Sequence, residues 1–413
     1  MFGQRLRETD GVDIEVIDPG KHNPDSGPDF FNSKIRINGT EWVGNVEIHV
    51  KASDWYRHGH DSDPAYENVI LHVVGISDKR VKRIDGSVIP QAEIHFPENF
   101  YKTVAALTEE IDMVRCAPNL HEISPLSITD WLETLAIERL QVKAQRVLDI
   151  YHQTEGDWEQ ATFVVLARAL GFGLNSDPFE MLARNLPIRI LHHHSDNLFQ
   201  LQAILFGQAG LLDSSLHIFD EYYQGLCNEY YFLARKYGLR PMRPGMWKFS
   251  KTRPQNFPHR RIAYLARLVE GGFSLFSKII ESRKDEEKLK KLFEVELDDY
   301  WHSHYTFDTD ERFISDRLST SSINIILINL VAPMIFAYSA KIGDPSLSES
   351  AIDILMGLPP ENNSIIRQWK ILGLNSDNAM RSQALLHLRK EYCDGRKCLY
   401  CRFGCYLLRK ASL

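Results

Sequence analysis

The chain has 413 residues, more than one typical hydrophobic core organises, so two or three domains are expected. Apolar residues make up 44% and charged residues 25%, which excludes a disordered or fibrous protein. The net charge of −7 excludes a uniformly basic nucleic-acid binder, and no apolar run approaches the roughly 20 residues that cross a bilayer.

The N-terminus has no apolar stretch long enough for a secretory signal, so the sequence predicts a cytoplasmic protein without a membrane partner. The first hundred residues or so alternate as strands do, and Asn38-Gly39 and Asp85-Gly86 are hairpin signals. Ser53 or Asp54 is expected to cap a short helix reaching His58, which permits a parallel crossover to a strand at 69–74. Residues 1–125 are therefore predicted to be a small domain with a mixed sheet.

From about residue 126 the apolar period is that of helices. The sequence predicts an α+β protein with a large all-helical domain over 126–390 and a cysteine cluster at 391–413. Three histidines at 192–194 fall between predicted helices and are expected to be solvated. The expected helices span 128–151, 158–171, 177–185, 195–206, 221–237, 260–270, 273–280, 287–297, 323–342, 346–357 and 375–392.

The strand at 41–51 is the part of the sequence richest in chemical groups. Because side chains alternate along a strand, its apolar residues share one face, which is expected to be buried, and its polar residues share the other. The apolar row is Val46, Ile48 and Val50, and the polar row is Asn45, Glu47, His49 and Lys51.

A second carboxylate, Asp29, precedes the expected partner strand. Asp29 and Glu47 could together hold a divalent ion that polarises phosphate and activates water, with His49 or Lys51 as the basic group. The alternative is that Asp29 is a turn residue after proline, and that Glu47 forms a surface ion pair with Lys34 or Arg36.

Pro28-Asp29 and, further on, Glu47-Ile48-His49 resemble the PD-(D/E)xK motif of restriction-endonuclease-like phosphodiesterases, over about residues 12–96. The resemblance implies a hairpin that carries the motif, then a helix and a further strand. It also implies that Asp29, Glu47, His49 and Lys51 are catalytic, with Mg²⁺ on the two carboxylates. His49 stands at the lysine position of the motif, and Lys51 follows on the same face.

A longer set of segments resembles an uncharacterised bacterial family, known only as a domain of unknown function. This resemblance spans nearly the whole chain and implies no established activity. It also implies an additional helical segment before residue 1, for whose acidic ligand Glu15 is the candidate substitute. The matching segments are 27–31, 44–50, 53–55, 69–74, 256–258, 361–363 and 391–393.

His58, His60 and His72 form a separate group of candidate ligands close to the same strand. Two histidines around one residue, followed by Asp61, can bind a transition metal, as in a small-molecule metalloenzyme. The alternative is an exposed loop for His58 and His60 and a core position for His72.

Residues 240–267 contain eight Lys and Arg residues, no Asp or Glu, and several aromatic residues. Such a stretch can bind phosphate and stack on bases, so we expect it to contact nucleic acid. The alternative is that its aromatics pack the loop and its arginines pair with the acidic segment 294–311, which includes Asp308. The expected contacts are Arg243, Lys248, Lys251, Arg253, Arg260 and Arg261.

Cys393, Cys398, Cys401 and Cys405 lie close together in the sequence, whereas Cys116 and Cys227 stand alone. Four thiols at such density in a reducing compartment are typical of a metal site, and a structural Zn²⁺ knuckle is the first interpretation. An iron–sulfur cluster and packing without metal are the alternatives.

The sequence thus favours a metal-dependent nuclease, active or decayed. The alternative is a non-catalytic nucleic-acid-binding or adaptor protein with a structural metal knuckle.

Overall fold

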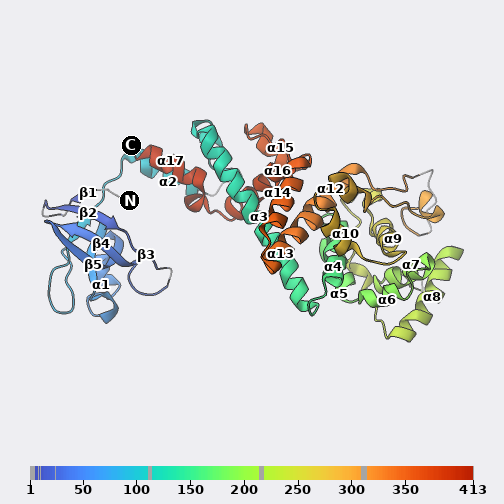
Figure 1. Cartoon of the computed structure of the whole chain (residues 1–413). Coiled ribbons are helices and arrows are strands. Elements are labelled where there is room, and N and C mark those ends of the chain that lie inside the picture. Colours follow the sequence, from blue (N-terminus) through green and yellow to red (C-terminus); the bar gives the residue numbers. More distant parts are fainter. Residues whose placement is uncertain are drawn as a thin grey trace. The chain divides into compact units, whose positions relative to one another are not determined.

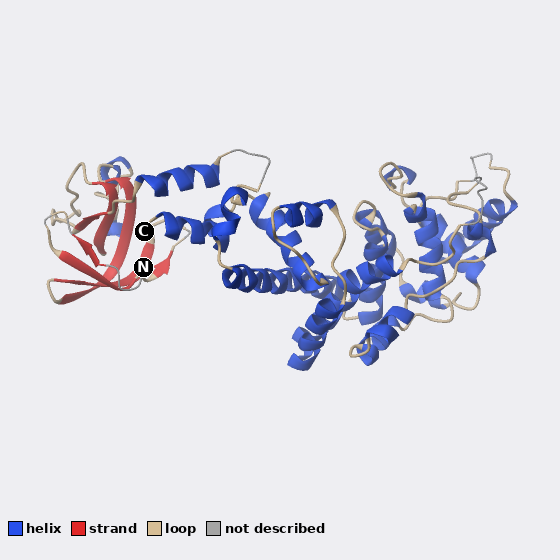
Figure 2. Ribbon diagram, turned by 90° about the horizontal axis from the view of Figure 1, so that it is seen from above, coloured by secondary structure: helices blue, strands red, loops and turns tan. Residues whose placement is uncertain are grey.

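The computed structural model describes residues 5–7, 9, 11–23, 25–109, 114–213, 218–307 and 314–412. The chain divides into two compact units, Met1–Ala106 with Leu408–Leu413, and Leu107–Leu407 (Figure 1). Within the described residues the strands belong to the first unit, and the second unit is helical (Figure 2). The division falls near residue 106, and residues 391–407 belong to the helical unit.

A seven-stranded mixed sheet forms the first unit, in the order β1-β2-β4-β5-β6-β7, with β3 paired to β4. The strands from β1 to β5 pair antiparallel, whereas β6 runs parallel to β5 and β7 parallel to β6. This confirms the predicted mixed sheet. The strands are β1 (Arg5–Arg7), β2 (Asp13–Asp18), β3 (Lys21–His22), β4 (Phe30–Ile37), β5 (Thr40–Lys51), β6 (Val69–Ile76) and β7 (Gln91–Glu93).

The hairpin predicted at Asn38-Gly39 joins β4 to β5, and both of these residues have positive φ, as the turn requires. The second predicted hairpin is reduced to a turn at Asp85-Gly86 that is closed by one bridge, between Lys82 and Val88. The segment after this turn forms only the short strand β7, in which Gln91 pairs with His72 of β6.

A short helix, α1 (Asp54–Arg57), provides the crossover that the parallel pair β5–β6 needs. Trp55 anchors α1, since it is fully buried and its indole N–H donates to the carbonyl of Lys82 at 3.2 Å. Gly44 lets the two strands approach: a Cβ there would lie 2.7 Å from the carbonyl oxygen of Asn68, just before β6.

The burial of β5 differs from the expectation that its apolar row faces the core. Val46 is buried, but Ile48 is 41% and Val50 74% exposed, whereas Glu47 is only 5% exposed. The polar row is covered because α1 and the loop after it, from His58 to Tyr66, pack over that face.

The second unit contains most of the helices, and every helix expected between 126 and 390 has a counterpart. The helices outside the expected set are α2 (Glu98–Thr108), which crosses the division between units, α6 (Ile188–His192), α15 (Ser364–Ile371) and α17 (Arg402–Ala411). The helices are α3 (Pro125–Gln153), α4 (Trp158–Leu170), α5 (Ser176–Arg184), α6 (Ile188–His192), α7 (Leu198–Gln208), α8 (Glu221–Tyr237), α9 (Pro258–Val269), α10 (Leu275–Ser282), α11 (Glu286–Lys291), α12 (Thr320–Ile326), α13 (Ala332–Ile342), α14 (Pro345–Gly357), α15 (Ser364–Ile371), α16 (Ala379–His387) and α17 (Arg402–Ala411).

The long helix α3 links two hydrophobic cores of this unit. It begins at the cap Ser124, whose side chain accepts from the N–H of Ser127. Leu132 and Leu135 pack in the smaller core with Trp369, whereas its later turns join the larger core.

A continuous helix over Thr320–Ile342 has the length and hydropathy of a membrane span, contrary to the expectation that no apolar run is long enough. Its most apolar window is 72% buried, as is typical of a core helix in a folded unit. His194 is also buried rather than solvated, and its ring nitrogens contact Gln200 and Tyr237 at 2.6 and 2.9 Å.

Candidate metal centre

Asp29 and Glu47 lie side by side because Phe30 of β4 pairs with Val46 of β5. The backbone N–H of Asp29 donates to Oε2 of Glu47 at 3.1 Å, and the N–H of Ile48 donates to Oδ2 of Asp29 at 2.9 Å. One oxygen of each carboxylate is therefore occupied by backbone. Among the described residues, Glu47 has no ion pair with Arg36, which pairs instead with Glu15 and Glu41, at 2.6 Å each. Glu15 is thus engaged away from the carboxylate pair.

The other oxygen of Glu47 faces imidazoles. Oε1 of Glu47 lies 3.4 Å from Nε2 of His49 and 3.4 Å from Nε2 of His60. Nε2 of His49 also lies 3.1 Å from Nδ1 of His58. Among the described residues, His49, His58 and His60 are the three that bring one ligand atom each within 4.8 Å of one another.

The 3.1 Å between His49 and His58 matches the spacing of neighbouring ligands around one metal ion. Metal–nitrogen bonds of about 2.0–2.1 Å in a tetrahedron place neighbouring ligand atoms about 3.3 Å apart. Imidazole nitrogen suits Zn²⁺ and its first-row neighbours, whereas Mg²⁺ prefers oxygen ligands. The geometry therefore fits a transition ion on the three histidines better than Mg²⁺ on the two carboxylates.

The ionisation of the centre follows from its burial. Burial, followed by the charges of His60 and His58, lowers the pKa of His49 to about 4. Burial also lowers the pKa of His60. Burial and the neighbouring charge of Asp29 raise the pKa of Glu47 to about 7. At neutral pH, His49 and His60 are neutral and carry the lone pairs that a metal needs.

A second layer of side chains fixes the imidazoles. Nδ1 of His49 lies 2.8 Å from Nε2 of the fully buried His72. The ring of His60 stacks on Tyr66 with centroids 3.7 Å apart, and Trp55 packs on both His60 and His72 at 5.4 Å. Because metal-binding histidines are usually held through their second nitrogen, His72 is a positioning residue for His49. The centre opens to solvent at His58, which is exposed.

Lys51 lies outside this group. Its side chain is exposed. The pKa of Asp78 is lowered mainly by two hydrogen bonds from Ser53, and to a smaller extent by the charge of Lys51. The backbone N–H of Lys51 donates to Asp54 at 3.2 Å.

The basic stretch of the second unit separates into two kinds of residue. Arg243, Lys248, Lys251 and Arg253 are exposed. Arg260 and Arg261, in contrast, are each 3% exposed, which removes them from the surface expected to contact phosphate. The buried pair has internal acceptors that lie far along the chain or in the preceding loop.

Arg260 donates to the backbone carbonyls of Trp301, His304 and Ser315, and Arg261 donates to the side chain of Asn256. Within the acidic segment, Arg260 therefore binds the backbone carbonyls of Trp301 and His304 rather than carboxylates. Asp308 lies outside the described residues. Trp247 is buried as well and donates to the carbonyl of Ala209 at 2.8 Å, so it packs the loop.

Cys393, Cys398 and Cys401 line one small cavity, and Cys116 lines it with them. Cys405 is held elsewhere, since its thiol donates to the carbonyl of Leu399 at 3.2 Å. Cys116 was not predicted to join these cysteines, because it lies far from them in the sequence and shows no ligand spacing with them.

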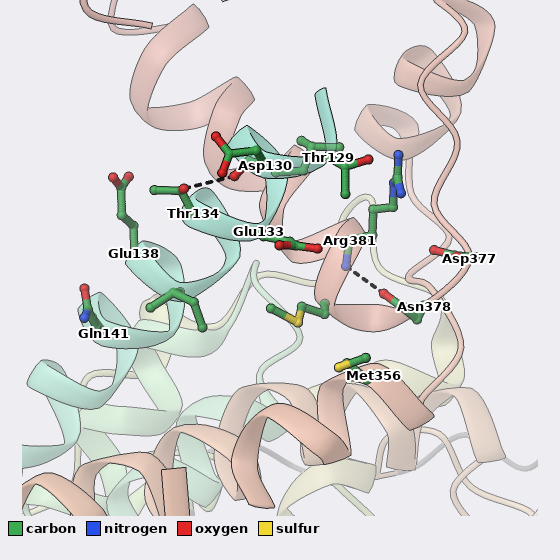
Figure 3. Close-up of a pocket in the computed structure, with 13 residues that line it drawn as sticks. Thr129, Asp130, Glu133, Thr134, Glu138, Gln141, Met356, Asp377, Asn378 and Arg381 are labelled. Carbon is green, nitrogen blue, oxygen red and sulfur yellow. Dashed lines mark hydrogen bonds between the residues drawn. The ribbon is translucent and has the colours of Figure 1, made fainter. Parts of the chain in front are cut away.

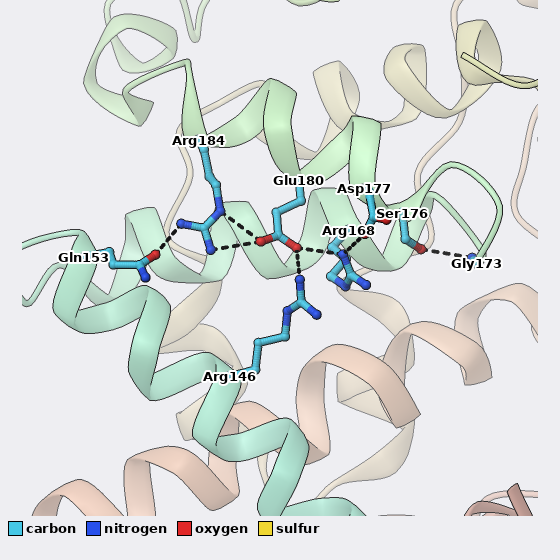
Figure 4. A network of polar contacts seen from close by, with 8 residues as sticks. All are labelled: Arg146, Gln153, Arg168, Gly173, Ser176, Asp177, Glu180 and Arg184. Atoms are coloured by element: carbon cyan, nitrogen blue, oxygen red, sulfur yellow. Dashed lines mark hydrogen bonds and ion pairs between the residues drawn. The ribbon is translucent and has the colours of Figure 1, made fainter. Parts of the chain in front are cut away.

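Two further polar features of the helical unit carry no comparable chemistry. A groove of about 660 Å³ runs along α3 toward α16 and is lined by carboxylates and Arg381, without histidine or cysteine (Figure 3). Glu180 of α5 binds three arginines from α3, α4 and α5 (Figure 4): Arg146 at 2.5 Å, Arg168 at 2.8 Å and Arg184 at 2.9 Å. This cluster joins helices and is structural.

The protein is an α+β protein, in which a sheet unit with a histidine and carboxylate centre is followed by a helical unit. The chain belongs to a family described as protein of unknown function (DUF2851), whose model matches residues 1–364. No curated protein and no solved structure matches the chain.

Proposed function

We propose that the protein is a metal-dependent hydrolase that cleaves phosphodiester bonds in nucleic acid. The observation that carries this proposal is the cluster of three imidazoles beside Glu47: Nε2 of His49 lies 3.1 Å from Nδ1 of His58, and Oε1 of Glu47 lies 3.4 Å from both His49 and His60. His49, His58 and His60 would hold a first-row transition ion such as Zn²⁺. Such an ion polarises phosphate and lowers the pKa of a bound water.

Protein side chains would provide the general base, its positioning and access for the substrate. Oε1 of Glu47 lies beside the candidate ligands, where it can take a proton from an attacking water. Asp29 keeps Glu47 in place through its backbone N–H. The exposed side of the centre, at His58, gives a substrate access.

Nucleic acid is the substrate class that best accounts for the exposed cations of the basic stretch. A protein of net charge −7 binds a polyanion through one concentrated basic region, and Arg243, Lys248, Lys251 and Arg253 provide one. Phosphodiester cleavage is also what the resemblance of Asp29, Glu47 and His49 to the PD-(D/E)xK motif implies.

A second candidate function is a non-catalytic binding or adaptor protein. The interlock of Asp29 and Glu47 favours it, because each carboxylate spends one oxygen on a backbone N–H and so stabilises the hairpin without any ligand.

The test compares Glu47→Gln with Glu41→Gln, an exposed glutamate on the same strand. The full chain is stripped of metal, resupplied with Zn²⁺ or Mn²⁺, and assayed on single-stranded DNA and on a nitrophenyl phosphodiester. We expect Glu47→Gln to slow cleavage by at least about 100-fold while Glu41→Gln retains it. Equal cleavage by both variants, or a wild type that binds metal and cleaves neither substrate, rejects the hydrolase and favours the adaptor.

A further inference from the structure

A small cavity in the helical unit is lined by four cysteines, which come from the first and the last segments of that unit. Cys116 comes from the segment after α2, and the other three come from the segment before α17. Cys393 ends a π-helical turn, Leu388–Cys393, and such turns are frequent at functional sites. These cysteines are free thiols, so no disulfide explains their convergence.

The four thiols are close enough to influence each other's ionisation. Burial, followed by the charges of Cys401 and Cys398, raises the pKa of Cys116 to about 12. Burial, followed by the charges of Cys116, Cys401 and Cys398, raises the pKa of Cys393. Thiols in this state are neutral and unreactive, but a bound metal centre displaces their protons.

The guanidinium of Arg115 points toward the four cysteines. Nη1 of Arg115 lies 3.3 Å from the carbonyl oxygen of Cys393 and 3.9 Å from the sulfur of Cys398. A centre held by four thiolates is anionic, and this guanidinium would partly balance it in a buried setting.

The spacing of the sulfurs separates two kinds of metal centre. Sulfurs bound to one tetrahedral Zn²⁺ at about 2.3 Å lie about 3.8 Å from one another. The described residues that bring three ligand atoms within 4.8 Å are the histidines of the first unit and not these cysteines. A four-iron cluster takes one thiolate on each iron and so spans a wider gap.

We infer that Cys116, Cys393, Cys398 and Cys401 hold a [4Fe–4S] cluster. The cluster ties together segments that lie 278 residues apart, as measured from Arg115 to Cys393. Closing so long a loop stabilises the folded unit by restricting the unfolded chain. Cys405 takes no part, which revises the ligand set that the sequence spacing suggested.

The test isolates the full chain without oxygen, after supply of iron and sulfide, and measures iron, zinc, acid-labile sulfide and visible absorption. Cys116→Ser is compared with Cys405→Ser and Cys227→Ser. We expect about four iron and four sulfide per chain in the wild type and in both controls, and loss of both in Cys116→Ser.

Three results would overturn the inference: one zinc per chain without sulfide, no metal after reconstitution, or loss of iron in Cys405→Ser but not in Cys116→Ser. If Cys116→Ser does not fold, the wild type still reports the kind of centre, and loss of iron in Cys405→Ser still refutes the ligand set. None of these results bears on cleavage by Glu47, so this inference stands or fails independently of the proposed hydrolase.

Discussion

His49 and His72 meet across the parallel strands β5 and β6, with Nδ1 of His49 2.8 Å from Nε2 of His72. If Nε2 of His49 binds an ion, the proton of His49 lies on Nδ1 and is donated to His72. His72 can therefore accept a hydrogen bond from the tautomer of His49 that acts as a ligand.

We expect His72→Leu to weaken Zn²⁺ binding about 10–100-fold without abolishing it, because the ligand remains but loses its orientation. His72→Gln should recover part of the affinity, since its amide oxygen can accept the same hydrogen bond. Titration calorimetry measures both variants, with the exposed His95→Gln as the control. Unchanged affinity in His72→Leu would contradict the positioning role.

The cations exposed in the basic stretch should carry the salt-dependent part of nucleic-acid binding. Replacing Lys248, Lys251 and Arg253 with glutamate should weaken binding to single-stranded DNA and lower the slope of log K against log salt by about two. Fluorescence anisotropy over a salt series measures this. A variant with Lys278, Arg367 and Lys370 changed to glutamate has the same net charge and should bind as the wild type does.

Arg260 should affect stability rather than nucleic-acid binding. Arg260→Ala removes the donor of three carbonyl groups, of the buried Trp301 and of the less buried His304 and Ser315. We expect a loss of about 3 kcal/mol in the free energy of unfolding, measured with urea. The exposed Arg253→Ala should change it by less than about 0.5 kcal/mol.

Glu180 should make the helical unit sensitive to acid. Burial opposes its ionisation, but the hydrogen bonds and charges of Arg184, Arg146 and Arg168 outweigh burial, so its pKa is lowered on folding. Its carboxylate therefore adds stability above its unfolded pKa of about 4.3, and this is lost as the pH falls through the lower, folded pKa.

We expect Glu180→Gln to cost about 1–3 kcal/mol at pH 7, and the gap between variant and wild type to close in acid. Urea unfolding at several pH values measures the gap, and Asp177→Asn, whose side chain is 88% exposed, should cost little. A gap that widens in acid would show that the sign is wrong.

Local patterns predicted much of the first unit. The Asn38-Gly39 turn is encoded by neighbouring residues, and the hairpin that it closes places Asp29 beside Glu47. Ser53 precedes α1 as expected, but its hydroxyl donates to Asp78 and forms no cap. The convergence of His58 and His60 on His49 was not predictable in the same way. It depends on how the loop after α1 packs against β5, and Tyr66 and Trp55 decide that packing.

Long-range partners account for the remaining differences. A count of charges in the basic stretch does not reveal that Arg260 is bound by carbonyl groups more than forty positions further on. Likewise, Cys116 reaches the terminal cysteines only through the folded helical unit. The exposure of Ile48 and Val50 follows from which face α1 covers, and alternation alone does not specify that face.

The crossover through α1 has a consequence for how this family can vary. Glu47, His49, His58, His60 and His72 all come from one continuous stretch, 47–72. Lengthening the chain at the tip between β4 and β5 would leave these groups undisturbed, whereas one extra residue between α1 and β6 would displace two of the imidazoles at once. Residues 47–72 therefore form one structural unit, and the centre can be gained, lost or transferred to another protein only with the whole segment.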